Sequence, residues 1–405
     1  MSGEAWFSSI RLKAGEDLMR NKDVYLDNAA TTRPYEEVVQ AVSDTMLKTY
    51  GNPSSLHQLG IEAEEALEKS REMTAASLQV EPGEVTFTSG GTETNNLVLK
   101  GIGRARQRAG RHIIASAIEH KSVLNTLQAM EEDGFEVTYL PVTSGGIVDT
   151  DALKEALRDD TILVSIMHVN NETGAIQPVD QVADILRKNR SQALLHSDAV
   201  QSYGKIPLHP RQSGIDLLTV SSHKIHGPKG MGALYKNRHV RLLPLIEGGE
   251  QEGGLRSGTV NLPAVVGFAK AVELNFHKAF EKQRHMRHLK NELQARLKDR
   301  LDDVVINTPE DEHAAPHILN FSIPRMKGEV LLRQLEKEGI FVSTGAACTS
   351  GRNTPSHVLN AMGVEDEMVQ GALRISFSAE NQEEDITRFM QQIVPAVERL
   401  KKLIR

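Results

Sequence analysis

The sequence predicts an α/β fold, in which helices cover both faces of a mostly parallel sheet, followed by a smaller α+β domain. Strand and helix patterns alternate from about residue 55 to residue 240, and such alternation gives parallel strands joined by helices. Beyond residue 300, strands and helices are mixed without that regular alternation. At 405 residues, the chain is also too long for one ordinary domain.

Seven short apolar segments of the first part are expected to form buried strands: residues 84–88, 112–117, 136–142, 161–169, 193–197, 217–221 and 232–235. Helices are expected before and between them, at residues 55–78, 91–100, 121–133, 151–158 and 179–188. The first of these helices has one apolar side, formed by Leu56, Leu59, Ala63, Ala66 and Leu67. Together these segments predict the sheet and the helices that cover it.

The second part begins with residues 263–300, where the scarcity of glycine and proline predicts one long helix or two abutting helices. It continues with expected strands at residues 318–323, 339–343 and 372–378, and expected helices at residues 329–336 and 383–403. The glycine-rich residues 248–254 are interpreted as a flexible loop, because structured patterns continue on both sides of them.

Composition narrows the class of protein. Hydrophobic residues make up 39% and charged residues 25%, as in soluble globular proteins, and a net charge of −7 argues against a broad nucleic-acid surface. The apolar runs at residues 162–169 and 264–272 are too short to span a membrane. A single cysteine excludes an intramolecular disulfide and indicates a reducing, cytoplasmic location. Residues 1–18 do not have the pattern of a signal peptide, and Met19 is an alternative start.

A junction between a strand and a helix, at residues 88–94 (TSGGTET), has the form of an anion site. Backbone N–H groups at a helix start attract an anion; Gly91 allows a phosphate to approach closely and Thr92 offers a hydroxyl. Many such turns bind nothing, so this segment alone is a weak signal. It is neither a G-x-G-x-x-G fingerprint nor a Walker A sequence, which leaves dinucleotide and ATP binding unsupported.

Asp198 and Gln201 follow the expected strand at residues 193–197. A carboxylate at this edge of a parallel sheet lies where α/β proteins bind ligands, although a helix N-cap is about as common for such an aspartate. Beside a pyridoxal phosphate ring, Asp198 would pair with the pyridinium nitrogen and Gln201 would donate to the phenolate oxygen.

Lys224 follows the expected strand at residues 217–221 and lies between two histidines. A lysine that forms a Schiff base needs a lowered pKa, which nearby cations or burial supply, whereas most lysines are solvated surface charges. Ser221 and His223 are short polar groups suited to a phosphate. His223 and His226 also have the spacing of two metal ligands, but no further ligand cluster accompanies them, so no metal site is predicted.

Three further polar residues follow strands or lie within one. His120 is expected to stack on a planar ring or to act as an acid or base, unless it is a surface histidine at a helix start. Asn171 is placed to hydrogen-bond a cofactor or a substrate. Arg374, within an apolar strand of the second part, needs an anion, either a substrate carboxylate or an internal acidic partner.

The only cysteine, Cys348, lies among the small residues of segment 342–351. No bulky apolar neighbour in that segment buries it, which indicates a loop from which the thiol reaches out and reacts. A reactive thiol together with a Schiff-base lysine suggests sulfur chemistry on an amino acid.

Eight segments together resemble the NifS/IscS-type cysteine desulfurases, which belong to the class V aminotransferase family of fold-type I pyridoxal-phosphate enzymes. They are residues 25–32 (YLDNAATT), 51–55 (GNPSS), 88–93 (TSGGTE), 119–121 (EHK), 168–172 (HVNNE), 222–230 (SHKIHGPKG), 256–259 (RSGT) and 344–348 (TGAAC). They follow the family's order from about residue 24 to the C-terminus and leave only residues 1–20 outside. Gly91, where alanine is common, and Ala346-Ala347, where Ser-Ala is common, depart without removing a functional group.

The resemblance implies catalytic roles for three residues. Lys224 would hold the cofactor and later move protons. His120 would stack on the ring and serve as acid or base. Cys348 would attack the sulfur of L-cysteine and become a persulfide, leaving alanine.

The resemblance also implies binding roles. The ring would be engaged by Asp198, Gln201 and Asn171. The phosphate would be held at the Gly91 turn by Thr92, Ser221 and His223, with Thr259 reaching in from a second subunit. The substrate carboxylate would be bound by Arg374, assisted by Asn171.

The architecture and partners follow from the same resemblance. It implies a large cofactor-binding domain at residues 33–275 around a mixed seven-stranded sheet, a small domain formed by residues 19–32 and 276–405, and an N-terminal extension at residues 1–18. A homodimer is expected. Residues 347–357 look like the long cysteine loop of enzymes that hand sulfur to an acceptor protein, an iron–sulfur scaffold or a tRNA-thiolating enzyme, with no direct nucleic-acid contact and no membrane.

Two alternatives stay open. A relative on the same fold, such as a selenocysteine lyase or an aminotransferase, would use the same lysine, and in transamination Cys348 would have no role. A catalytically silent protein that only docks sulfur carriers would bind no cofactor, although the intact Lys224, Asp198 and Cys348 argue against it.

Overall fold

The computed structural model describes residues 23–344 and 355–404 of the chain. Residues 347–354 of the expected loop, Cys348 included, and the expected N-terminal extension lie outside the described residues. Within the described part, no helix is long and apolar enough to cross a membrane.

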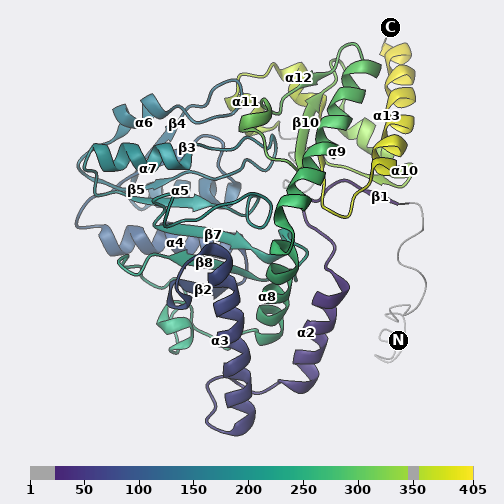
Figure 1. Cartoon of the computed structure of the whole chain (residues 1–405). Coiled ribbons are helices and arrows are strands. Elements are labelled where there is room, and N and C mark those ends of the chain that lie inside the picture. The colour runs from purple at the N-terminus through teal and green to yellow at the C-terminus, as the bar shows by residue number, and fades with distance from the viewer. Residues whose placement is uncertain (1–22, 345–354, 405) are drawn as a thin grey trace, which may run out of the picture.

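The larger sheet has seven strands, in the order β2 (Val85–Thr88), β8 (Gly232–Lys236), β7 (Leu217–Ser221), β6 (Leu194–Asp198), β5 (Thr161–Ser165), β3 (His112–Ser116) and β4 (Glu136–Leu140). Strand β8 runs antiparallel to its two neighbours, and the other neighbouring pairs are parallel. The predicted mostly parallel, mixed sheet is therefore confirmed (Figure 1). Strand β5 is shorter than expected and ends at Ser165 rather than at residue 169.

Alternate side chains of these strands enter two different cores. Ile113, Leu163 and Leu217 pack with α4 (Gly91–Arg106) and α5 (Lys121–Glu132). Their neighbours Ile114, Val164 and Leu218 pack in the other core, with residues of α3 (Gln58–Leu78), α6 (Thr150–Ala156), α7 (Val179–Lys188) and α8 (Leu262–Phe276). This period of two explains why the strand segments read as continuous apolar runs, since both faces of the sheet are buried.

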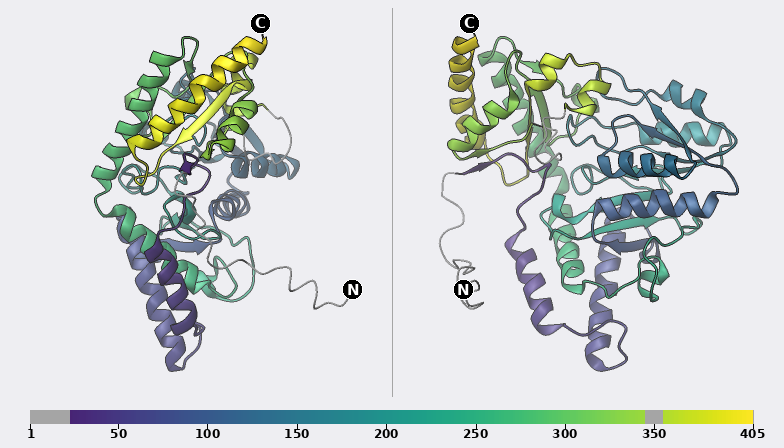
Figure 2. Two further views of the ribbon diagram at one scale, coloured as in Figure 1. Left: turned by 90° about the vertical axis from the view of Figure 1, so that its right-hand side faces the viewer. Right: turned by 180° about the vertical axis from the view of Figure 1, so that it is seen from behind.

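Helix α2 (Glu36–Lys48) and helix α3 both pack against α8 and extend away from the C-terminal end of the molecule (Figures 1 and 2). The sequence analysis did not predict α2. It also started the next helix too early, because α3 begins at Gln58, and Leu56 lies before it with 97% of its surface exposed. Leu59 is 38% exposed, so the expected apolar side faces the core of this chain only from Ala63 onward.

Seven large apolar side chains of this region are exposed, and we call them the α2–α3 apolar cluster: Val39, Met46, Leu47, Tyr50, Leu56, Leu59 and Ile61. Residues 39 and 46 are seven positions apart and so share one face of α2. An exposed apolar group of this size on adjoining elements marks an interaction surface.

The smaller sheet contains β12 (Ala372–Ser376), β10 (Ile318–Ser322) and β9 (Val305–Ile306), all antiparallel, and β1 (Val24–Tyr25) pairs in parallel with β11 (Ile340–Phe341). Its core is shared with α9 (Ala279–Arg300), α10 (Gly328–Lys337) and α13 (Glu383–Ile404). Two short helices, α11 (His357–Ala361) and α12 (Asp366–Gln370), complete this part. Helices α8 and α9 are the two abutting helices that the sequence allowed, and they break at Lys278, which has a φ of 55°.

Candidate functional site

A cavity of about 290 Å³ opens where strands β6 and β7 end, beside the first turn of α4. Ten of the predicted residues line it: Gly91, Thr92, His120, Asn171, Asp198, Gln201, Ser221, His223, Lys224 and Arg374. They come from both parts of the chain, since Arg374 belongs to the smaller sheet. Two predicted residues are not among them: Thr259 is exposed and does not line this cavity, and Cys348 lies outside the described residues.

The junction of β2 and α4 has the geometry expected of an anion site. Gly90 has a φ of 143°, a conformation open to glycine, and Gly91 starts the helix. The first N–H groups of a helix have no partner within it, and the helix dipole adds positive charge there. A Cβ atom on Gly91 would lie 2.8 Å from Cγ2 of Val200, so glycine rather than alanine suits this chain at that position.

Asp198 is buried at the end of β6, and both of its carboxylate oxygens accept hydrogen bonds. Asn95 Nδ2 donates to Oδ2 at 2.7 Å, and the backbone N–H of Val200 donates to Oδ1 at 2.9 Å. The residues after Asp198 form turns, so the helix N-cap alternative does not apply. The carboxylate is therefore held rigidly at the wall of the cavity.

Asn95 and Ser122 also orient His120, and the sequence analysis missed both. The backbone N–H of Ser122 donates to His120 Nδ1 at 3.1 Å, which makes Nδ1 an acceptor. The Ser122 hydroxyl, 2.8 Å from Nδ1, accepts from Asn95 Nδ2 and is then the donor to the ring. Because Nδ1 accepts, the ring proton is on Nε2. His120 is thus the N-cap of α5 and a cavity residue at once.

Lys224 lies in the short 3₁₀ helix Ser222–Lys224, directly after β7. Its Nζ donates to the carbonyl oxygens of Ala29 at 2.6 Å and Ala30 at 2.7 Å. Gln201 Nε2 donates to the same Ala29 oxygen at 2.8 Å. The backbone of residues 29–30, which follow β1, thus binds the Lys224 amine. Nothing in the local sequence around Lys224 indicates this contact.

The surroundings of Lys224 are cationic. Burial, followed by the charges of Lys224, Lys205 and Lys229, lowers the pKa of His223 to about 4. Burial, followed by Lys224 and Arg374, lowers the pKa of Lys205 to about 7. Lys224 therefore lies in the cationic surroundings that were expected of a Schiff-base lysine.

Arg374 is 3% exposed, and its guanidinium spans the two parts of the chain. Nη1 donates to the carbonyl of Asn171 at 2.8 Å, and Nη2 pairs with Asp27 Oδ1 at 2.7 Å. Its Nε has no partner among the described residues. The internal ion pair left open by the sequence is therefore present, and the same guanidinium also faces the cavity.

His226, the other half of the possible metal pair, is used elsewhere. Its ring stacks on Tyr35 with centroids 4.2 Å apart, and its Nδ1–H donates to the carbonyl of Arg33 at 2.8 Å. Across residues 23–344 and 355–404, no group of three or more metal-binding side chains comes together.

Glu119, next to His120, is a buried acid that the sequence analysis did not select. Its Oε1 accepts hydrogen bonds from Ser116 Oγ at 2.7 Å and from the N–H of Met167 at 2.8 Å. Burial raises its pKa to about 8, with the nearby charge of Asp198 acting in the same direction. Glu119 could have been selected from the sequence, because it is an acidic residue that follows an apolar strand.

The described residues on either side of segment 345–354, which contains Cys348, contact residues around the cavity. Before this segment, Ser343 pairs through its backbone with Arg374, at 2.7 and 3.2 Å. After it, the Ser356 hydroxyl donates to Glu172 Oε2 at 2.5 Å, and the His357 ring lies 3.0 Å from the carbonyl of Glu119. Ser343 therefore contacts Arg374, whereas Ser356 and His357 contact Glu172 and Glu119, the neighbours of Asn171 and His120.

Comparisons with known proteins agree with this geometry. Residues 24–389 match the family model described as aminotransferase class-V. The chain is 41% identical to the cysteine desulfurase IscS of Dictyoglomus turgidum over 382 residues, which cover 94% of this chain and 96% of that protein. The solved structure of a NifS-like protein superimposes with a TM-score of 0.88 at 41% identity, covering 93% of this chain and 99% of the other. The structure titled SspA in complex with cysteine gives 0.78 at 34% identity, covering 88% and 99%.

Proposed function

Since the chain belongs to the class V aminotransferase family, among the NifS/IscS-type cysteine desulfurases, we propose that it removes sulfur from L-cysteine and passes it, as a persulfide on Cys348, to an acceptor protein. The observation that carries this proposal is the set of ten predicted residues around one cavity. The solved SspA complex, which contains cysteine, supports the choice of substrate.

Enzymes of this family depend on pyridoxal 5′-phosphate, and the residues of the cavity fit it. Buried Gln201 Oε1 and Arg374 Nε have no partner among the described residues, as expected of atoms that serve a bound group. Thr92, Ser221 and His223 would hold the phosphate at the helix start. When bound, the cofactor supplies a protonated ring that draws electrons from the substrate.

The ring would be held by three further side chains. Asp198, fixed by Asn95 and Val200, would keep the ring nitrogen protonated. Gln201 would face the phenolate oxygen. His120 would cover the ring face, and its Nε2–H would serve as a hydrogen-bond donor there. Lys224 would attach the cofactor and move protons from its place against Ala29 and Ala30.

Arg374, with Asn171, would bind the substrate carboxylate through the N–H groups not used by Asp27 and the Asn171 carbonyl. The Cys348 thiolate would then attack the substrate sulfur. A sulfur–sulfur bond forms, the carbon–sulfur bond breaks, and the carbon takes up a proton to give alanine. The contacts of Ser343 with Arg374 and of Ser356 with Glu172 support this reach, because they hold the described residues on either side of segment 345–354 near the cavity.

The acceptor in this proposal is an iron–sulfur scaffold or a tRNA-thiolating enzyme in the cytoplasm. The proposal includes a large domain at residues 33–275 and a small domain at residues 19–32 and 276–405, which the separate apolar cores support. It also includes a homodimer. The exposed α2–α3 apolar cluster supports dimerisation, because a face of this kind needs a partner.

The test is to incubate the purified protein with L-cysteine without reductant, quantify alanine, and map added sulfur by mass spectrometry. Alanine and one extra sulfur on the Cys348 peptide are expected. Cys348→Ala should keep the yellow cofactor and lose alanine production, and Lys224→Ala should lose turnover altogether. Lys188→Ala, an exposed lysine of α7, is the control.

Full turnover by Cys348→Ala would refute the nucleophile, and normal activity of Lys224→Ala would refute the cofactor lysine. Bound cofactor with no alanine would instead favour an aminotransferase. Comparing alanine yields from cysteine and selenocysteine separates a desulfurase from a selenocysteine lyase.

A further inference from the structure

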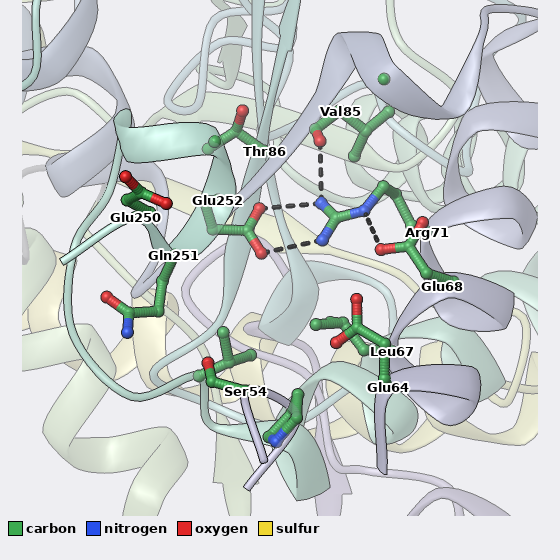
Figure 3. Close-up of a pocket in the computed structure, with 14 residues that line it drawn as sticks. Ser54, Glu64, Leu67, Glu68, Arg71, Val85, Thr86, Glu250, Gln251 and Glu252 are labelled. Atoms are coloured by element: carbon green, nitrogen blue, oxygen red, sulfur yellow. Dashed lines mark hydrogen bonds and ion pairs between the residues drawn. The ribbon is translucent and has the colours of Figure 1, made fainter. Parts of the chain in front are cut away.

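A second cavity, of about 680 Å³, lies between the early part of α3, the edge strand β2 and the loop at residues 250–253. Figure 3 shows Arg71 and Glu252 among the residues that line it, paired directly with each other. Pro53 and Ser54, from the segment between α2 and α3, also line it. The cavity is thus bounded by the segment that carries Tyr50 and Leu56 of the α2–α3 apolar cluster.

Arg71 and Glu252 form a paired, nearly buried contact. Arg71 Nη1 and Nη2 lie 2.8 and 2.9 Å from the two carboxylate oxygens of Glu252, and these side chains are 11% and 2% exposed. Both also bind the backbone of edge strand β2: Phe87 N–H donates to Glu252 Oε2 at 2.7 Å, and Arg71 Nη1 donates to the carbonyl of Val85 at 3.0 Å. The pair therefore joins α3, β2 and the loop at one point.

The loop at residues 250–258 contains several residues with a positive backbone φ angle. Glu252 has a φ of 49°, in the left-handed region that a non-glycine residue rarely occupies, and Gly253, Gly254 and Gly258 also have positive φ. Glutamate at such a position is maintained by its surroundings, here by the contact with Arg71.

A second contact ties the other end of the loop to the helix start that would hold the phosphate. Arg256 Nε pairs with Glu93 Oε1 at 3.0 Å, and Glu93 Oε2 accepts from the N–H of Ser89 at 2.8 Å. Inside the loop, Gly258 N–H donates to Gln251 Oε1 at 3.0 Å. The loop is therefore braced up to the residue before Thr259.

Thr259 follows this braced loop, yet it is exposed and does not line the cavity of its own chain. We propose that Arg71 and Glu252 are positioning residues that hold the 250–258 loop so that Thr259 is presented to the cofactor phosphate in a second copy of the chain. This inference rests on the proposed function, since it needs both the cofactor and the homodimer.

The first test measures cofactor affinity and dimer mass together. Arg71→Met and Glu252→Gln are expected to weaken pyridoxal phosphate binding by about tenfold, comparable to losing one hydrogen bond to a charged group, with the dimer mass unchanged. Arg71→Lys should restore cofactor affinity only in part, because an ammonium group cannot form the two parallel hydrogen bonds of the guanidinium. Arg187→Met, at the exposed pair of Arg187 with Asp184, is the matched control.

The double variant Arg71→Met/Glu252→Gln leaves no unpaired buried charge, so it is the variant to use if a single change prevents folding. If both residues act through their mutual contact, the double variant should bind the cofactor no more weakly than the single variants. Unchanged cofactor affinity in a folded, dimeric double variant would overturn the proposal.

Mixed dimers test whether the effect crosses to the other copy. In an Arg71→Met chain paired with a Lys224→Ala chain, the remaining attachment site receives Thr259 from an intact loop, and cofactor retention should be normal. In a wild-type chain paired with an Arg71→Met/Lys224→Ala chain, that site receives Thr259 from an unsupported loop, and retention should fall. Retention is measured after dialysis, as cofactor fixed to Lys224 by borohydride reduction.

The reverse pattern would mean that Arg71 serves its own site and would overturn the inference. Thr259→Ala separates this result from failure of the proposed function. If Thr259→Ala weakens binding across the dimer while Arg71→Met does not, the positioning role alone is wrong. If Thr259→Ala has no effect in either arrangement, the proposed role of Thr259 is wrong, and this inference fails with it.

Discussion

At the scale of single residues, the organisation of the cavity depends on Asn95. Its one amide group donates to Asp198 and to Ser122, and Ser122 in turn fixes the ring of His120. Asp198, proposed to pair with the ring nitrogen, and His120, proposed to cover the ring face, are thus connected through Asn95, which is uncharged. Residues of this kind set tautomer and orientation rather than supplying chemistry.

Ser122→Ala tests that arrangement. The change removes the hydroxyl donor to His120 Nδ1, although the backbone N–H of Ser122 remains. We expect kcat for alanine formation to fall about tenfold with little change in KM, because one orienting hydrogen bond is lost while the substrate groups stay in place. Steady-state kinetics across pH measures this; a change in KM alone would contradict it.

Glu119→Gln tests the buried acid. Because burial raises the folded-state pKa of Glu119 to about 8, the folded chain keeps a proton that the unfolded chain loses above pH 4.5. Its stabilising effect is complete below that pH and is lost as pH rises towards 8. The variant has no such proton, so its stability relative to wild type should rise between pH 5 and 8, by at most about 1.4 kcal/mol per pH unit. Urea unfolding at several pH values measures it, and a constant difference would contradict it.

The predicted residues that line the cavity include several that follow apolar strands. Asp198 and Lys224 could be selected because strand ends of a parallel sheet meet at one edge. Asn95 could not, because it lies inside α4 and its partner Asp198 is 103 positions away. The carbonyl partners of Lys224 lie 194 and 195 positions away, and no local pattern indicates them.

At the scale of elements, the least predictable part is the pair α2 and α3. A helical pattern indicates an apolar side but not what that side faces, and Leu56 and Leu59 were expected on the apolar side of a helix at residues 55–78. In the structure they are exposed, as are Met46 and Leu47 of α2, a helix that was not predicted from the sequence. The strand before Asn171 was expected to extend too far for a related reason: residues 166–169 are buried and, apart from His168, apolar, but they lie beyond β5.

Leu56→Glu tests the proposed dimer at this cluster. Leu56 is 97% exposed within one chain, so the substitution should not destabilise the fold of the chain, whereas it would place a charge in an apolar interface. We expect the mass in light scattering to fall from two chains towards one, with the circular dichroism spectrum unchanged. Arg187→Glu, at an exposed position on α7 outside the cluster, is the control, and an intact dimer in Leu56→Glu would contradict the assignment.

At the scale of the whole molecule, five buried or half-buried histidines make the fold sensitive to acid. Burial lowers the pKa to about 4 for His168, His196, His223 and His226, and well below the usual value for His317. Each stays neutral in the folded chain down to that pH, while the unfolded chain takes up a proton below about pH 6.5. Their contribution to stability is therefore complete above pH 6.5 and is lost as pH falls towards 4.

Two other buried groups do not change this sign. Between pH 4.5 and 8, Glu119 lowers stability as the pH rises, which is opposite to the effect of the histidines, but it is a single group against five histidines. Lys205, whose pKa burial lowers to about 7, contributes its pH dependence above that value. Exposed carboxylate pairs titrate mainly below pH 4.5, so the histidines dominate between pH 4.5 and 6.5.

We therefore expect the urea midpoint to fall steeply between pH 6.5 and 4.5, each histidine contributing at most about 1.4 kcal/mol per pH unit. His196→Gln should lessen the slope by about one proton. Its ring nitrogens lie 2.9 and 3.0 Å from the hydroxyls of Ser165 and Thr219, and an amide preserves part of this bonding. His239→Gln, at an exposed histidine, should leave the slope unchanged. A midpoint that stays constant over this range would show that the buried rings are not titrated on unfolding.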